Sequence, residues 1–174
     1  MPFSRKTWNC IGVRSRFQSA SVFVDPVFFT VLLCHDPESA KLLEVPSKHA
    51  QTRLKRDHVI WFTTCGRDGQ PHAVPVWFWW DGKSFLIYSV PGQKVRDVEA
   101  NPKVNLHLNT DPEGNDVVRI DGTARVAARQ APAYKVPAYV RKYRELIKGF
   151  DWTPKVFSEQ YRIAIIVRPT RFHE

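Results

Sequence analysis

The amino-acid sequence predicts a mainly β (α+β) fold: a six-stranded antiparallel β-barrel, closed or nearly closed, with short flanking helices. Three observations carry this prediction. Six runs of β-branched and aromatic residues follow one another from residue 58 onward, an Asp81-Gly82 pair joins two of them as a tight hairpin, and residues 103–109 alternate between apolar and polar side chains. Strands at this spacing are typical of small barrels. The expected strands are residues 58–65, 72–80, 84–89, 103–109, 116–126 and 161–168.

Three residues mark irregular points in these strands. Pro75 has no N–H to donate to a ladder, so its strand is expected to lie at an edge or to carry a bulge there. Gly122 predicts a bulge in the fifth strand, and Pro169 is expected to end the sixth. An interrupted edge is a place where a ligand can reach backbone groups.

Helices are expected between and before the strands. Ser47 is placed to cap a short helix over residues 48–56, whose polar character suggests a solvated face with little core. Residues 93–100 form a two-turn helix that stops before a proline, and residues 133–148 form the one sizeable helix. Another short helix is expected over residues 36–44.

The length of 174 residues, with 43% hydrophobic content, suits one good core. We expect a barrel domain over residues 58–174, a helical lead-in over 35–57, and an N-terminal extension over 1–34 that is disordered or loosely attached. The apolar run at residues 20–34 is too short and too interrupted for a transmembrane helix. Basic residues before it leave a signal peptide conceivable, but no small-residue cleavage site follows, so this alternative is less favoured.

Charge and cysteine usage narrow the function classes. The chain carries 26 Lys and Arg against 17 Asp and Glu, a formal net charge of +9, but the charge is diffuse. No nucleic-acid-binding module can be read from its spacing, and attraction of an anionic small molecule is the better expectation. The cysteines Cys10, Cys34 and Cys65 have no zinc-site spacing, and their sparse, odd count fits a reducing cytosol. We therefore predict a cytoplasmic protein without a membrane or metal partner.

The segment after the third expected strand carries the candidate chemistry. The strand ends at Ser89, a Pro91-Gly92 turn follows, and the next helix opens with Lys94 and Arg96 in its first turn. A helix N-terminus offers unpaired N–H groups and a partial positive charge, so two cations beside it can form a phosphate site. The alternative is an ordinary charged helix with both cations in water.

This order of strands, turns and charged helix resembles the pyridoxamine 5′-phosphate oxidase-like split-barrel superfamily. Residues 74–78 with Trp80-Asp81-Gly82, 86–89, 101–104 and 117–122 are most similar to the flavin/deazaflavin oxidoreductases that use coenzyme F-420. The resemblance covers residues 53–171 and implies an FMN-binding split-barrel fold.

The resemblance also implies a cofactor site. Lys94 would hold the phosphate or acidic tail of the cofactor, and the backbone of the second strand would lie against its ring. In the family the partner subunit completes each site, which implies a homodimer, and Asn115 would face the partner's cofactor. The cofactor-binding residues implied in this way are Pro75, Val76, Trp77, Ser89, Gln93, Lys94, Arg96 and Asn115.

One departure bears on the cofactor. Pyridoxamine phosphate oxidases have an arginine in the second strand that grips the flavin phosphate, and Val74 stands at that position here. The deazaflavin branch binds its cofactor without this arginine, so the resemblance favours coenzyme F-420 (8-hydroxy-5-deazaflavin) over FMN. The expected reaction is hydride transfer to an electron-poor small molecule, an enone, quinone or tetrapyrrole-like compound. The alternatives are an FMN-dependent oxidase or reductase on the same fold, and a non-catalytic flavin- or haem-binding module.

No catalytic residue is assigned, because the sequence contains no convincing triad, carboxylate pair or metal cluster. His72 and His107 can each be considered as a proton donor, although a structural role is the better expectation for a histidine on a strand. The indoles of Trp61, Trp77, Trp79 and Trp80 can either wall a planar substrate or belong to the core and a dimer interface.

Overall fold

The computed structural model describes residues 45–174. The expected extension at residues 1–34 and the expected helix at residues 36–44 lie outside the described residues. All statements below concern the described part of the chain.

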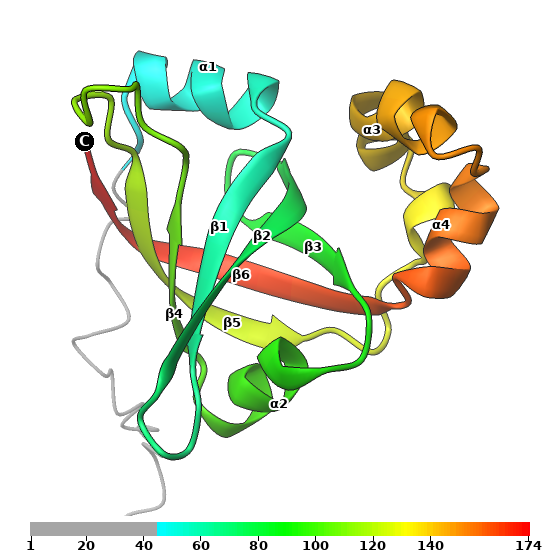
Figure 1. Cartoon of the computed structure of the whole chain (residues 1–174), viewed down its shortest axis with the longest axis horizontal. Helices are drawn as coiled ribbons and strands as arrows, with labels where there is room; N and C mark the ends of the chain where they lie inside the picture. The colour runs from blue at the N-terminus through cyan, green and yellow to red at the C-terminus, as the bar shows by residue number, and fades with distance from the viewer. Residues whose placement is uncertain (1–44) are drawn as a thin grey trace, which may run out of the picture. The chain divides into compact units, whose positions relative to one another are not determined.

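Within it, six antiparallel strands close into a barrel in the order β1-β2-β3-β6-β5-β4 (Figure 1), which confirms the predicted fold class. The first three form a meander joined by tight turns. Gly82 adopts a positive φ of 94° in the turn between β2 and β3, as the Asp-Gly pair predicted. The strands are β1 Val59–Cys65, β2 Pro71–Trp80, β3 Phe85–Ser89, β4 Lys103–His107, β5 Arg119–Val126 and β6 Ile163–His173.

Helices surround the barrel. Figure 1 shows α1 over one end of the barrel, α2 at the opposite end, and α3 with α4 together on one side. The helices are α1 Lys48–Arg56, α2 Gln93–Ala100, a single 3₁₀ turn Ala133–Lys135, α3 Pro137–Gly149 and α4 Pro154–Gln160. The bounds predicted for α1 and α2 are confirmed.

Helix α1 contributes more to the core than its composition suggested. Ser47 caps it as predicted, with its hydroxyl accepting from the Ala50 N–H at 3.1 Å. Ala50 and Leu54, however, are fully buried and belong to the barrel core, so the prediction of a helix with little core is wrong. Two apolar side chains spaced four residues apart are enough to dock one face of the helix.

The C-terminal half differs from the prediction in two places. The single helix expected over residues 133–148 is a 3₁₀ turn followed by α3, since Pro137 has no N–H and begins a new helix instead of continuing one. Helix α4 was not predicted. Strand β6 also continues through Pro169 to His173, contrary to the prediction that this proline ends it.

Pro169 is tolerated because the ladder is already irregular there. The register between β5 and β6 shifts between Asp121 and Gly122: Asp121 lies opposite Arg171, while Gly122 lies opposite Pro169, leaving Thr170 as the extra residue. The irregularity predicted at Gly122 is confirmed, although the extra residue lies on β6 and not in the fifth strand. A Cβ at Gly122 would lie 2.8 Å from the carbonyl oxygen of Arg168, so the close approach of the two strands requires glycine.

Strand β2 pairs with β1 over most of its length and with β3 only near its C-terminal end. Residues Pro71 to Trp77 pair with β1, whereas the ladder with β3 begins only at Phe78. Pro75 therefore lies on a stretch with one free edge, as its lack of an N–H predicted. This free edge splits the barrel between β2 and β3.

Candidate cofactor-binding cleft

A cleft of about 440 Å³ lies at this split. One wall is the free stretch of β2, another is the end of β3 with the first turn of α2, and the third comes from α4 and the segments on either side of it. Its lining residues are Val59, Pro75, Val76, Trp77, Tyr88, Ser89, Val90, Lys94, Phe150, Trp152, Phe157 and Tyr161.

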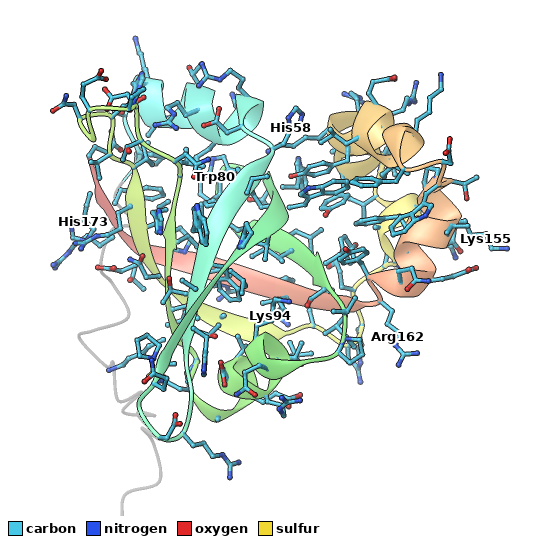
Figure 2. All side chains as sticks on the ribbon, in the orientation of Figure 1. His58, Trp80, Lys94, Lys155, Arg162 and His173 are labelled. Carbon is cyan, nitrogen blue, oxygen red and sulfur yellow. The ribbon has the colours of Figure 1, made fainter. Side chains whose placement is uncertain are left out.

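Lys94 is the cation of this cleft. It lies on the barrel side of α2 (Figure 2), and its Nζ donates to Ser89 Oγ at 3.3 Å. Ser89 is almost fully buried and donates in turn to the Val90 carbonyl at 2.8 Å. Burial lowers the pKa of Lys94 below its ordinary value. Within residues 45–174 no carboxylate forms an ion pair with Lys94, so a half-buried positive charge faces the cleft without a counter-ion.

The start of α2 adds backbone donors beside Lys94. Gly92 is the N-cap residue, and no side chain caps the helix. The N–H groups of Val95 and Arg96 donate to the Gly92 carbonyl, at 3.2 and 3.3 Å, while those at the very start of a helix have no intrahelical acceptor. Ammonium, buried hydroxyl and helix N-terminus are three different kinds of group that favour an anion at one point.

Aromatic stacking joins the β2 wall of the cleft to the C-terminal helices. Trp77 stacks on Tyr143 of α3, with ring centroids 4.6 Å apart and planes inclined by 3°, and on Phe157 of α4 at 5.4 Å and 16°. Phe157 stacks on Tyr161 at 4.7 Å. The C-terminal helices therefore hold this wall in place, and a planar ligand would meet rigid aromatic edges and faces.

Tyr143 also fixes α3 to the barrel. Its hydroxyl accepts from the Phe78 N–H at 2.7 Å and lies within hydrogen-bond distance of the carbonyls of Phe78 and His58, at 2.7 and 2.8 Å. The hydroxyl thus takes the place of a strand partner just beyond the end of the β1–β2 ladder. These hydrogen bonds fix the position of α3 beside the cleft.

Five of the eight expected cofactor-binding residues line the cleft: Pro75, Val76, Trp77, Ser89 and Lys94. The other three do not. Gln93 and Arg96 line a separate hollow on the other face of α2, where Arg96 donates to Gln93 Oε1 at 2.6 Å. Asn115 is exposed in the loop between β4 and β5, where its N–H donates to Asp111.

The structure adds an interaction that the sequence did not reveal. Asp97 of α2 is only 2% exposed, and its carboxylate accepts from the Thr64 hydroxyl at 2.8 Å and the Gln93 amide at 2.6 Å. His72 Nδ1 lies 3.0 Å from the same carboxylate. Burial alone would raise the pKa of Asp97, but these three hydrogen bonds outweigh it and the pKa lies below the ordinary aspartate value. The network joins α2, and with it Lys94, to β1 and β2.

The two histidines considered as proton donors lie away from the cleft. His72 belongs to the Asp97 network, and His107 stacks against Trp61 with ring centroids 6.0 Å apart. Trp80 belongs to the barrel core, and Trp79 lines another hollow. Of the four tryptophans proposed as candidate walls, only Trp77 lines the cleft. In the described residues no group of His, Cys, Asp or Glu is arranged to hold a metal ion, and no helix there is long and apolar enough to cross a membrane.

Comparison with known proteins identifies the family. The family model described as pyridoxamine 5′-phosphate oxidase matches residues 46–173. An F420 reductase of known structure is 23% identical, with a TM-score of 0.54 over 74% of this chain and 98% of its own. A FAD-binding protein from Mesorhizobium loti is 21% identical, with a TM-score of 0.52 over 75% and 93% of the two chains. HutZ, a haem storage protein from Vibrio cholerae, is 13% identical, with a TM-score of 0.51 over 71% and 90%.

At these identities the solved structures establish the shared fold alone. An uncharacterized protein of Rhizobium meliloti is 41% identical over 44 residues, a match that spans 25% of this chain and 29% of that relative's length. The family model, in contrast, covers almost all of the described residues, including every strand and both ends of the cleft. The chain belongs to the pyridoxamine 5′-phosphate oxidase family of split β-barrels.

Proposed function

We propose that this protein is an oxidoreductase that binds coenzyme F-420 in the β2–β3 cleft and transfers hydride to an electron-poor small molecule. One observation carries the proposal: Lys94 places a half-buried, uncompensated positive charge at one end of a cleft that is otherwise mainly apolar and aromatic. A flavin-like molecule has the matching shape and polarity, since it joins a planar ring system to an acidic tail.

The acidic end would be held at Lys94. An ammonium group has three N–H donors, and Ser89 accepts only one of them. The remaining donors, with the free N–H groups at the start of α2, suit a phosphate better than a neutral group.

The ring would lie along β2. Val76 and Trp77 are on the stretch of this strand that has no β3 partner, so a ligand can approach the backbone there without breaking a ladder. Trp152, Phe157 and Tyr161 close the other side and would exclude water from the reacting face.

The chemistry would rest mainly on the cofactor. When bound, a reduced deazaflavin supplies a hydride to a polarised C=C or C=O bond. The protein groups of the cleft bind, orient and desolvate, which fits a lining that contains no His, Asp, Glu or Cys. The proton that completes the reduction would come from solvent at the open mouth of the cleft.

Two further observations support F-420 over the other cofactors found on this fold. Val74 packs against the barrel core, so the cationic contact to a flavin phosphate that an arginine gives at this position is missing. The cleft lining also lacks histidine, cysteine and methionine, three of the side chains that commonly serve as axial ligands of haem iron.

The test is to titrate the purified full chain with F-420, FMN and haem, and then to mix it with reduced F-420 and enone, quinone or tetrapyrrole acceptors. We expect tightest binding of F-420 and faster oxidation of its reduced form with at least one acceptor class. Near-stoichiometric FMN in the purified protein would reject the deazaflavin assignment. Tight binding of reduced F-420 with no acceleration by any acceptor would reject the enzymatic assignment in favour of a binding module.

A further inference from the structure

A second hollow of about 330 Å³ lies where the end of α1, the end of β2 and the first turns of α3 meet. It shares no lining residue with the cofactor cleft. Figure 2 shows His58, one of its lining residues, between α1 and α3. Its chemistry is not used by the function proposed above.

Lys142 forms the inner cationic group of this hollow. It is half-buried, its Nζ donates to the Leu54 carbonyl at 3.2 Å, and the same Nζ lies 3.7 Å from the centroid of the Phe78 ring. Leu54 is in the last turn of α1, so one donor of Lys142 serves as a cap for a carbonyl without an intrahelical partner. Two N–H donors of the ammonium remain for another acceptor.

The side chains that line this hollow include several positive charges and no negative charge. Lys55 and Arg141 line it together with Lys142, and none of its lining residues is acidic. The nearby carboxylate of Asp57 is occupied, since it forms ion pairs with Arg53 and Arg56, each at 2.9 Å. Cations brought together at a concave surface raise the local potential for an anion. Capping of α1 explains the bond to Leu54 but not the presence of Lys55 and Arg141.

The hollow also has an aromatic wall. Trp79 and Trp80 both line it; Trp79 is only partly buried, whereas Trp80 is almost completely buried. An indole face beside several cations suits a ligand that combines a flat ring with a negative charge. The volume is near the lower end of the range for small-molecule sites, about 300 Å³, and so fits a single ring more readily than a dinucleotide.

We propose that this hollow is a second binding site, for a small aromatic anion, with the acid group at Lys142 and Arg141 and the ring against Trp79. The recognisable chemistry is a planar ring that carries a carboxylate or a phosphate. Because α3 presents Lys142 to this hollow while the adjacent Tyr143 stacks on Trp77 of the cofactor cleft, an occupant would lie against the helix that supports the aromatic wall.

The probes are benzoate and phenyl phosphate, with inorganic phosphate and phenol as partial ligands, titrated against the full chain by calorimetry. We expect at least one of the two aromatic anions to bind about tenfold or more tightly than either partial ligand. Inorganic phosphate binding as tightly as the better of the two aromatic anions would overturn the proposal, because it would show a general anion patch. The carboxylate and phosphate arms distinguish the two possible acid groups.

Variants locate the binding. Lys142→Met is expected to weaken binding of the tighter-binding aromatic anion by about 10- to 100-fold, the loss typical of one charge-assisted hydrogen bond. Arg141→Gln is expected to act in the same direction and, being exposed, to leave the fold intact. Lys148→Met, an exposed change on the same helix outside the hollow, is the matched control. Unchanged affinity in both Lys142→Met and Arg141→Gln would overturn the assignment.

Proton uptake gives an independent check. Burial lowers the pKa of Lys142 to about 8, with the nearby Asp57 acting in the opposite direction, and the other titratable groups facing it are Lys55, His58, Arg141 and Tyr143. An anion that binds the charged form must therefore draw a proton onto Lys142 at about pH 9. Calorimetry in buffers of different ionisation enthalpy should show this uptake in the wild type and not in Lys142→Met. Affinity for F-420 should be the same in both proteins, which separates this proposal from the cofactor assignment.

Discussion

Lys94 is held in place by a hydroxyl and by its own helix, not by an opposite charge. Its contact with the buried Ser89 fixes the direction of the side chain, while the missing counter-ion leaves its charge available to a ligand. A lysine paired to a carboxylate would have to lose that partner before it could bind a phosphate. The present arrangement has no such cost, and this is why we assign the acidic end of the cofactor to this residue.

Asp97 has a complementary role, because it anchors the helix that carries Lys94. Asp97→Asn should lower the free energy of unfolding by about 1–3 kcal/mol, since an amide has one acceptor oxygen in place of two and cannot accept from Thr64, His72 and Gln93 together. Urea unfolding at neutral pH measures this loss. Glu99→Gln, an exposed change on the same helix, is the control and should be nearly neutral. A loss in Asp97→Asn no larger than in the control would contradict the anchoring role.

The same carboxylate predicts a pH dependence. The pKa of Asp97 is lowered in the folded protein, so its stabilising contribution is present above the ordinary aspartate pKa and is lost as the pH falls through the folded value. The difference in unfolding free energy between wild type and Asp97→Asn should therefore shrink on acidification below about pH 4. A difference that stays constant from neutral to strongly acidic pH would show that the charge of Asp97 contributes nothing.

Among the elements, the β5–β6 pair depends most closely on one residue. Gly122→Ala should destabilise the protein by about 1–3 kcal/mol, because the added Cβ would lie 2.8 Å from the Arg168 carbonyl oxygen and backbone atoms must shift. Gly149→Ala at the end of α3 is the control, because a Cβ there meets nothing within 4 Å. Thermal unfolding of both variants gives the comparison, and equal stability would mean that the bulge adapts without strain.

Elements whose ends are marked by nearby proline, glycine or asparagine residues could be predicted well from the sequence. Helix α2 begins after Pro91-Gly92 and ends before Asn101-Pro102, and its predicted and observed bounds agree. Strand β6 was cut short at Pro169 because the proline was weighed alone, whereas its tolerance depends on Gly122, which is distant in sequence and opposite in the sheet. Contacts of this kind leave no local signal.

In the candidate site, too, local contacts could be predicted from the sequence and contacts between distant segments could not. The proximity of Ser89 and Lys94 was predicted because one turn joins their strand and helix, whereas the aromatic wall depends on how the C-terminal helices fold back. Grouping Arg96 with Lys94 overlooked the helical period, since two residues along a helix turn the side chain by about 200°. That rotation places Arg96 on the other face of α2, beside Gln93.

At the scale of the whole molecule, the open cleft is the basis for expecting a homodimer. The mouth of the cleft is bounded by exposed residues, Val90 and Phe150 among them, and the family resemblance implies a second subunit across such a site. We expect light scattering to give the mass of two chains at micromolar concentration. We also expect cofactor binding to weaken on dilution into the monomer. A protein that is monomeric and binds F-420 with undiminished affinity would contradict this assembly.

The most direct test of the central claim is the affinity of the full chain for F-420 after removal of the Lys94 charge. Lys94→Ala should weaken binding by about 10- to 100-fold, because one charge-assisted contact to the acidic end is lost. Lys83→Ala, which removes an exposed charge in the β2–β3 turn, should leave the affinity unchanged. Equal affinities of Lys94→Ala, Lys83→Ala and wild type, measured by calorimetry, would contradict the account.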